Sequence, residues 1–515
     1  MSDTDTDDGE LFATLLGSGG ILIVGIALEL GISFFGKLVI AQLFEPVDYG
    51  ALSLGLTVMA LTSTLTLLGL NTGIARYLPR FEDEERKRGV LVSGITIGLT
   101  LSIVVGGLIA AFAPTIATVA FDKPSMGPIL RIFGLTIPLA AGMKLAIGSI
   151  QGMKDSIPRV LVQNITLPVT RIAAVIVAIV VGAEILGIAW AYLFSYLAAF
   201  AMAVRYLWRS TPLFSFEVDA TPMYRTLLVF SAPLIISAAM SVVLSDIDMF
   251  LLGIFRDDIA EVGVYGVVYP LAELLLVSIS AFGFLGLPIV SELESNGRDE
   301  AVERVYQIVT KWMFMATFPV FLALVLFPSQ SISYTFGSKY ASGALGLAIL
   351  ATGFMSHVIA GPNKQTLTSF GRTRLVMYDT AVVAAVNVVL NLILIPSQGV
   401  LGAAVATAVS YALLNVLVSG QLYLEYGIHP FSIALVRPAA GAAALSGLLY
   451  IGVTSLWATS PSSILAFFAL FAIGYAGVVF RLGGVEQEEI TLFLEFEEKY
   501  DLDLGPLKAL LVRLR

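Results

Sequence analysis

Hydrophobic runs constrain the fold of this sequence more than any other feature. They recur from Leu15 almost to Phe480, and each is long enough to cross a bilayer. A helix needs about 20 residues to span a hydrocarbon core of about 30 Å. Charged residues make up only 13% of the chain, whereas about 25% is usual in soluble domains. We therefore predict an all-α polytopic membrane protein without a sizeable domain outside the bilayer.

Gly, Pro and charged residues separate these runs and predict fourteen transmembrane helices. The predicted ranges are 15–42, 48–75, 89–113, 127–150, 157–181, 184–207, 226–254, 261–289, 303–327, 343–365, 374–396, 399–424, 433–456 and 461–480. Of the 29 Lys and Arg residues, 22 lie in the loops and tail of one side, and the opposite loops contain only Lys123, Arg256 and Lys339. Because cytoplasmic loops carry the positive excess, we predict a cell-membrane protein with both termini in the cytoplasm.

The composition also excludes several classes of function. The chain has no Cys, which rules out disulfides, thiolate metal sites and cysteine nucleophiles. Its two histidines, His357 and His429, form no metal-binding motif, and no GxxxxGK[ST] phosphate loop occurs. The net charge of -9 argues against a nucleic-acid partner, since such partners require a basic surface. We predict neither an enzyme nor a cofactor or metal site.

An internal repeat divides the predicted helices into two halves. Leu186–Tyr196 matches Leu401–Tyr411 at six of eleven positions, with a shift of 215 residues. Glu45–Gly50 matches Glu261–Gly266 at the Glu and at the Tyr-Gly pair, with a shift of 216. Repeated halves are common in transporters, although helices rich in Gly and Ala also resemble one another by composition alone.

The repeat predicts two parallel six-helix lobes with elements appended after them. The predicted domains are 1–215 for the N-lobe, 216–430 for the C-lobe, 431–485 for helices 13 and 14, and 486–515 for a cytoplasmic amphipathic tail. The acidic segment 1–10 lacks the basic start of a signal peptide, and we interpret it as a retained cytoplasmic tail.

Ionisable residues inside the predicted spans are few, and inserting each at mid-bilayer costs at least about 2.5–3.5 kcal/mol, so each is a functional candidate. They are Glu29, Lys37, Lys144, Arg171, Asp246, Asp248, Glu273 and His357. We predict that Arg171, Lys144 and Lys37 bind substrate at several depths of one cavity, and the guanidinium of Arg171 suits a phosphate. Lys37 and Lys144 are equally consistent with snorkelling or structural pairing.

Three acidic residues of this set are predicted to serve coupling or gating. They are Glu29, Asp248 and Asp246. The two aspartates are about 200° apart on a helix, so at most one of them lines a given cavity. As a hypothesis, Asp248 pairs with Lys37 when the outer gate is closed. His357 has no acidic partner nearby in the sequence, and we interpret it as a packing residue rather than a proton relay.

Three segments carry a resemblance to a known family. They are Glu45–Gly50, Gly148–Gly152 and Leu287–Glu292. Together with the fourteen spans and twin lobes, they resemble the oligosaccharide flippase family, which is the polysaccharide-biosynthesis branch of the multidrug/oligosaccharidyl-lipid/polysaccharide superfamily. The acidic composition and the lack of Cys resemble haloarchaeal members of that family.

This resemblance implies a transporter that flips a polyprenyl- or dolichyl-linked oligosaccharide by alternating access, for surface polysaccharide or N-glycan assembly. It implies that the sugar-lipid and membrane lipids are the partners, with glycosyltransferases and a ligase of the same pathway, and that the protein is a monomer. Two alternatives remain open. One is a cation-coupled multidrug exporter of the same superfamily, and the other is a non-transporting membrane scaffold.

Overall fold

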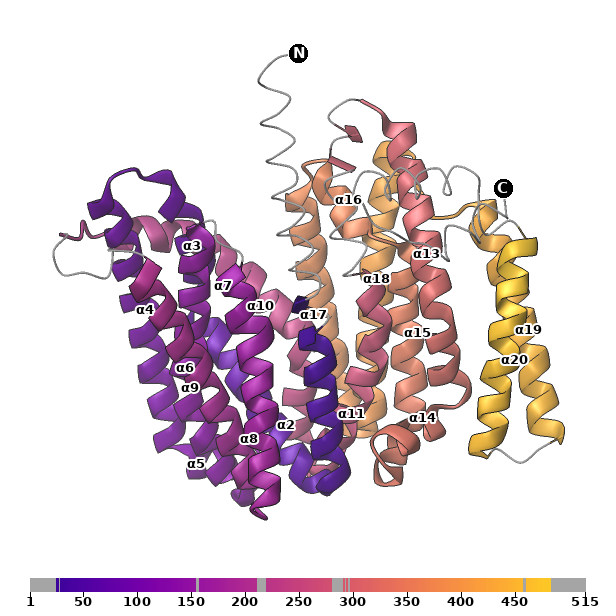
Figure 1. The fold of residues 1–515 in the computed structure, drawn as a ribbon, viewed down its shortest axis with the longest axis horizontal. Coiled ribbons are helices and arrows are strands. Elements are labelled where there is room, and N and C mark those ends of the chain that lie inside the picture. The colour runs from indigo at the N-terminus through magenta and orange to yellow at the C-terminus, as the bar shows by residue number, and fades with distance from the viewer. Residues whose placement is uncertain are drawn as a thin grey trace. The chain divides into compact units, whose positions relative to one another are not determined.

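Helices form the architecture of the part of the chain that the structure describes. The computed structural model describes residues 25–26, 28–153, 157–210, 219–279, 290–291, 293–294, 297–456 and 460–482. Figure 1 shows coiled ribbons and no arrow among these residues. The predicted all-α class is therefore confirmed.

The long helices follow the predicted spans, and short helical turns connect some of them. Their bounds are α2 (Pro46–Thr66), α3 (Leu70–Tyr77), η1 (Leu78–Arg80), α4 (Glu84–Ala111), α5 (Ala113–Val119), η2 (Pro124–Met126), α6 (Gly127–Gly152), α7 (Ile157–Arg159), η3 (Val160–Thr166), α8 (Leu167–Val180), α9 (Ile185–Ser210), α10 (Tyr224–Phe255), α11 (Ala260–Glu273), η5 (Leu274–Leu276), α13 (Asp299–Leu326), α14 (Pro328–Thr335), η6 (Ser338–Gly343), α15 (Ala344–Ala360), α16 (Asn363–Ser369), α17 (Thr373–Gln398), α18 (Val400–Tyr426), α19 (Ile433–Leu456) and α20 (Pro461–Arg481). A further stretch of helix, 28–43, precedes them and is called the first helix below.

Twelve helices of the described chain are long and apolar enough to cross a membrane, and each overlaps one of the predicted spans. The predicted span 226–254 corresponds to α10, a helix of 32 residues. The predicted span 15–42 is helical from residue 28 to its end, and its beginning lies outside the described residues. The predicted tail at 486–515 also lies outside them. The polytopic membrane fold is therefore confirmed.

The chain forms two compact units that alternate along the sequence. Unit 1 comprises Met1–Leu271, Ser329–Leu347 and Thr380–Ser410, and unit 2 comprises Ala272–Pro328, Ala348–Asp379 and Tyr411–Arg515. This division reflects contacts within each unit, whereas the predicted lobes follow from the sequence repeat. The predicted lobes at 1–215 and 216–430 therefore stay a prediction.

In unit 1, α2 and α11 meet near their N-terminal ends through two glycines. A Cβ atom on Gly50 would lie 2.2 Å from the carbonyl oxygen of Ile259, and a Cβ on Gly263 would lie 2.1 Å from that of Pro46. No side chain fits at such distances. Small residues allow helix backbones in membranes to approach closely, and here they bring together the beginnings of the two helices that carry the matching Tyr-Gly pairs.

Gly50→Ala is expected to lower the melting temperature of the purified protein. The added methyl group forces α2 and α11 apart, and overpacking of this kind costs about 1–3 kcal/mol. Thermal unfolding in detergent measures the effect. Gly107→Ala on α4 is the matched control, because a Cβ at Gly107 meets nothing within 4 Å and Ala is favoured over Gly inside a helix. Equal melting temperatures for the two variants would contradict a close contact at Gly50.

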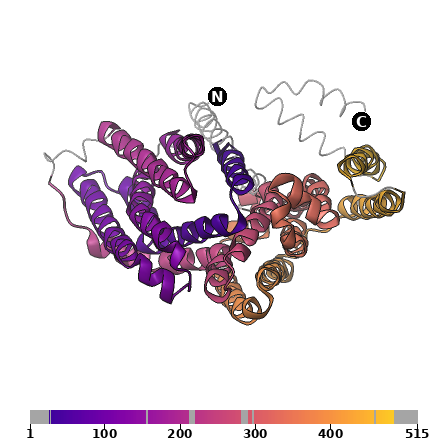
Figure 2. The same ribbon diagram turned by 90° about the horizontal axis from the view of Figure 1, so that it is seen from below.

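In unit 2, α19 and α20 pack against α13 through aromatic side chains. The ring centroids of Phe318 and Phe471 are 6.3 Å apart. The hydroxyl of Tyr475 on α20 donates to the carbonyl oxygen of Met315 on α13, at 2.9 Å. In Figures 1 and 2 the yellow helices α19 and α20 lie side by side. These are the helices predicted as the thirteenth and fourteenth spans, and their aromatic contacts attach them to unit 2.

Candidate functional site

A buried carboxylate in unit 1 is the centre of a polar cluster built from four helices, called the Asp248 cluster below. Asp248 on α10 is 1% exposed. Its Oδ2 accepts hydrogen bonds from the hydroxyl of Tyr265 on α11, at 2.6 Å, and from that of Thr407 on α18. Its Oδ1 accepts from the amide of Asn391 on α17, at 2.5 Å, and the same amide donates to Asn387, at 3.1 Å. Each of these four partners is at most 2% exposed.

The Asp248 cluster has one ionisable carboxyl group, and no cation lies among the contacts described for it. An uncompensated carboxylate in a membrane interior is unfavourable, so the cluster is suited to bind a proton or a small cation. Carboxylate, hydroxyl and amide oxygens are the ligands that hard cations prefer. The buried Oδ1 of Asn391 has no hydrogen-bond partner among the described residues, so its lone pairs are available to a cation. A single carboxylate matches the charge of a monovalent cation.

Glu29 lies in a second cluster of unit 1, beside an irregular stretch of backbone. Its carboxylate accepts a hydrogen bond from the side-chain amide of Asn164. Asn164 lies in η3, a π-helical turn that directly precedes α8. Pro168 in the first turn of α8 has no N–H to bond the carbonyl four residues before it, which disturbs the helix there. Turns of this kind are frequent at functional sites, and this one brings Asn164 to Glu29.

The guanidinium of Arg171, on α8, lies over two tyrosine rings. Its Cζ is 4.7 Å from the ring centroid of Tyr192 and 5.5 Å from that of Tyr196, both on α9. Glu29 is close enough to attract it electrostatically. The Nε of Arg171 is buried and has no hydrogen-bond partner among the described residues. Cation–π contacts orient the guanidinium without using its N–H donors, so these donors remain suited to bind an anion such as a phosphate.

The two aspartates of α10 have separate surroundings, and one of them lies near Lys144. The ammonium of Lys144 on α6 donates to the hydroxyl of Thr64 on α2, at 3.0 Å, and Asp246 is close enough to attract it. Asp246 therefore faces Lys144, whereas Asp248 faces α11, α17 and α18. Lys37 is half-buried in the first helix and is not among the described partners of Asp248. The pairing of Lys37 with Asp248 stays a prediction.

His357 lies in a polar network of unit 2. Its Nδ1 is 2.6 Å from the Oδ1 of Asn415, and its ring centroid is 5.7 Å from that of Tyr411. The amide of Asn363 donates to the hydroxyl of Ser419, at 3.0 Å, and so extends the network. The described hydrogen-bond and ring partners of His357 are neutral, and the one described charge that acts on it is the cation of Lys364. Neutral partners and a nearby cation suit a packing residue.

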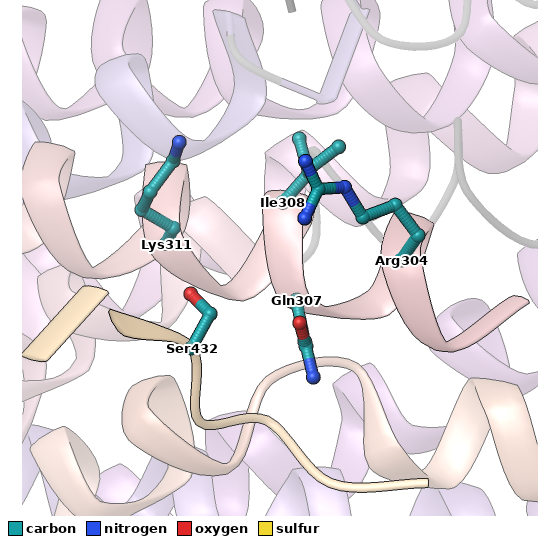
Figure 3. A pocket seen from close by; sticks show the side chains of 5 residues that line it. All are labelled: Arg304, Gln307, Ile308, Lys311 and Ser432. Carbon is teal, nitrogen blue, oxygen red and sulfur yellow. The ribbon is translucent and has the colours of Figure 1, made fainter. Parts of the chain in front are cut away.

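Unit 2 also contains a small basic recess beside α13 (Figure 3). It is lined by Arg304, Gln307, Ile308, Lys311 and Ser432. Arg304 and Lys311 are two turns apart on α13, and in Figure 3 the Lys311 side chain points upward while that of Arg304 extends toward Ile308. None of the site residues predicted from the sequence lines this recess.

Two families match the chain. Residues 15–294, more than half of the 515 residues, match the family described as polysaccharide biosynthesis protein. The chain belongs to this family. Residues 233–393 also match the MatE family, and that range includes Asp248 and Asn391. The polysaccharide biosynthesis family was the one that the sequence resembled, and the assignment is therefore confirmed.

Two proteins illustrate the relatives of this family member. An uncharacterized membrane protein, MJ1068 of Methanocaldococcus jannaschii, is 22% identical over 402 residues, which cover 74% of this chain and 78% of the relative. The probable low-salt glycan biosynthesis flippase Agl15 of Haloferax volcanii is 29% identical over 196 residues. That second match covers 38% of this chain and 41% of Agl15, so it concerns less than half of either protein.

Solved structures share the fold at low sequence identity. The lipid II flippase MurJ, in an inward closed conformation, has a TM-score of 0.72 and 14% identity, and the match covers 89% of this chain and 98% of MurJ. An inward-facing multidrug resistance MATE family transporter has a TM-score of 0.64 and 16% identity, covering 77% of this chain and 94% of that one. These likenesses show that the family member has the fold of such transporters.

Sequence reasoning on this family member found Asp248 and missed its partners. Tyr265, Asn387, Asn391 and Thr407 are neutral, and neutral polar side chains are much less unfavourable in a bilayer than charged ones, so they did not stand out. One signal was available. Asn387 and Asn391 are four residues apart in one predicted span and therefore share a helix face, which marks a polar stripe inside the membrane.

Proposed function

We propose that this member of the polysaccharide biosynthesis family flips a lipid-linked oligosaccharide, carried on polyprenyl or dolichyl phosphate or diphosphate, by alternating access. The family match over residues 15–294 carries the proposal. Agl15 is named as a probable glycan biosynthesis flippase, and MurJ as a lipid II flippase. The protein then moves its substrate without changing its covalent structure, so it is a transporter and not an enzyme.

The substrate's head group combines phosphate with many hydroxyls and requires a polar, cationic surface. Arg171, Lys144 and Lys37 supply cations in the membrane-spanning helices of the first half of the chain. Arg171 is the principal phosphate ligand in this proposal. A tyrosine ring contacts its guanidinium without using the N–H donors, and its Nε has no partner among the described residues. A guanidinium can also form two parallel hydrogen bonds to one phosphate. The hydrocarbon tail needs no polar site, since the bilayer solvates it.

Coupling is proposed to occur at Asp248, with gating roles for Asp246 and Glu29. A proton or a monovalent cation neutralises Asp248 and changes the strength of the contacts that join α10 to α11, α17 and α18. A ligand that binds one conformation more tightly than another shifts the population toward it. The bound ion therefore selects one conformation of the transporter, and its release allows the other.

The proposed setting is the cell membrane, with both termini in the cytoplasm and the protein acting as a monomer. Glycosyltransferases on the cytoplasmic side would supply the sugar-lipid, and a ligase on the outer side would consume it. The flipped glycan would then enter surface polysaccharide or N-glycan assembly. This orientation rests on the asymmetry of Lys and Arg between the two sides.

A cation-coupled multidrug exporter is the second candidate, because residues 233–393 match the MatE family. The Asp248 cluster suits either function, since both need an ion site. The first-half cations favour an anionic substrate instead, because a cationic drug would be repelled by Arg171 and Lys144.

Ligand-induced stabilisation of the purified protein distinguishes the two candidates. A ligand present at 100 times its Kd stabilises the folded state by about 2.7 kcal/mol. We expect a polyprenyl-diphosphate sugar to raise the melting temperature and a cationic dye to leave it unchanged. The same polyprenol without phosphate is the control and should have no effect. A rise with the dye alone would support the exporter and overturn the flippase.

A further inference from the structure

Lys123 caps the C-terminal end of α10. Its ammonium donates to three backbone carbonyls, those of Phe121, Gly253 and Arg256, at 2.9, 2.9 and 2.7 Å. Lys123 is 6% exposed, and the three bonds use all of its N–H donors. Burial lowers the pKa of this ammonium, while the carboxylates of Asp257, Asp122 and Asp258 act in the opposite direction.

Lys339 caps the C-terminal end of the first helix in the same manner. Its ammonium donates to the carbonyl oxygens of Phe44, at 2.6 Å, and Gln42, at 3.2 Å. The hydroxyl of the neighbouring Tyr340 donates to the carbonyl of Ala41, at 3.1 Å. Glu45 lies 3.7 Å from the ammonium. Both caps use favourable electrostatics, because the last carbonyls of a helix lack partners and carry partial negative charge.

The two caps are reciprocal with respect to the sequence repeat. Lys123 and Lys339 are 216 residues apart (339 − 123), which equals the shift between the matching Tyr-Gly segments. Lys123 comes from the first half of the chain and caps α10, the first long helix of the second half. Lys339 comes from the second half and caps the first helix of the chain. All of these residues belong to unit 1, so the contacts lie within one compact body.

Further contacts join the two halves at this same end of unit 1. Gly50 and Gly263 bring α2 and α11 into backbone contact. Within the second half, Arg256 forms an ion pair with Glu261 at 2.7 Å and donates to the carbonyl of Pro396 at 3.0 Å. The lysine caps differ from the packed glycines in one respect. Each joins an ammonium to main-chain oxygens that water can bond equally well after separation, so the caps can break and re-form.

We propose that Lys123 and Lys339 form a reciprocal latch that holds the outer end of the transporter closed and positions the helices carrying Asp248 and Glu29. The latch rests on the proposed function in two ways: the predicted orientation identifies this end as the outer one, and alternating access requires this end to open. Asp248 precedes Arg256 by eight residues, about 12 Å along α10. Release of the Lys123 cap therefore frees the C-terminal end of α10, close to the carboxylate of Asp248. In this way, ion binding at Asp248 is linked to opening of the outer end.

Cysteine labelling tests the latch directly, because the chain contains no Cys. Leu54→Cys is the reporter, since Leu54 is 0% exposed and packs against Gly253, whose carbonyl oxygen accepts a hydrogen bond from Lys123. In this background, Lys123→Met and Lys339→Met should each raise labelling by a membrane-impermeant maleimide from outside, by roughly tenfold, because each removes charge-assisted hydrogen bonds. The double variant should exceed both. Lys87→Met, on half-buried Lys87 of α4, is the control and should change nothing.

The outcomes separate the latch from the proposed function. Unchanged labelling in both lysine variants, with melting temperatures near that of the parent, overturns the latch. Lys123→Arg keeps charge and donors, and restored protection in that variant supports the latch even if Lys123→Met folds poorly. Faster labelling from the cytoplasmic side only would support the latch and overturn the proposed orientation. Faster labelling from outside in a protein that moves no sugar-lipid would support the latch and overturn the flippase.

Discussion

Asp248→Asn is expected to reduce ion-driven transport about 10- to 150-fold while the helices remain folded. Asn has nearly the same volume as Asp, but it cannot carry the charge that balances a bound cation. Hydrogen bonds to charged groups contribute about 1.5–3 kcal/mol, and each 1.4 kcal/mol is a factor of ten. The added N–H₂ group would also face the donor amide of Asn391. The measurement is the transport rate in proteoliposomes with and without an imposed Na⁺ or proton gradient.

Asp246→Asn is the matched control for this experiment. Asp246 lies on the same helix, two residues away, but it is half-buried and outside the Asp248 cluster. We expect the Asp246→Asn variant to keep its dependence on the gradient and the Asp248→Asn variant to lose it. A variant at Asp248 that still responds to the gradient as the parent does would show that coupling occurs elsewhere.

Arg171→Gln is expected to weaken binding of the lipid-linked substrate by a similar factor. A guanidinium can donate two charge-assisted hydrogen bonds to a phosphate, and losing one of them costs about 1.5–3 kcal/mol. Arg171→Lys keeps the charge but not the paired geometry, so its effect should be intermediate. The loss should appear as a higher KM for the sugar-lipid, measured from transport rates over a range of substrate concentrations.

A control variant and a stability argument separate loss of substrate binding from misfolding or a general loss of positive charge. Arg131→Gln, on the exposed side of α6, removes a cation from a helix of the same unit and should leave KM unchanged. The cation–π contacts of Arg171 with Tyr192 and Tyr196 contribute only about 0.5–2 kcal/mol to folding, so the Arg171→Gln variant should still fold. An unchanged KM in folded protein would remove Arg171 from the substrate site.

The helices and the intramembrane charges could be predicted from the sequence because the bilayer imposes strong rules on both. A membrane span needs a long apolar run, and a charge within it is rare enough to identify by inspection. Arg171 and Asp248 were found for that reason. Their surroundings were not, because Tyr192 and Asn391 lie on other helices, and only the packing of the fold brings them close.

The lysine caps are a second example of contacts that could not be predicted from the sequence. Lys123 and Lys339 entered the sequence analysis only as exceptions to the charge asymmetry between loops. Their partners are backbone carbonyls, such as that of Gly253, and every residue has one, so no side-chain pattern marks the contact. The separation of 216 residues was the one signal present in the sequence, and it has meaning only once the helix ends are located.

Transbilayer movement of a lipid-linked sugar in proteoliposomes tests the central claim most directly. A fluorescent polyprenyl-diphosphate sugar is reconstituted with the purified protein, and the fraction of head groups that an impermeant quencher reaches is followed over time. The account predicts that this fraction rises beyond the outer-leaflet value with the parent protein and the Arg131→Gln variant, and much more slowly with Arg171→Gln. A fraction that stays at the outer-leaflet value, in vesicles where the same protein exports a cationic dye, would contradict it.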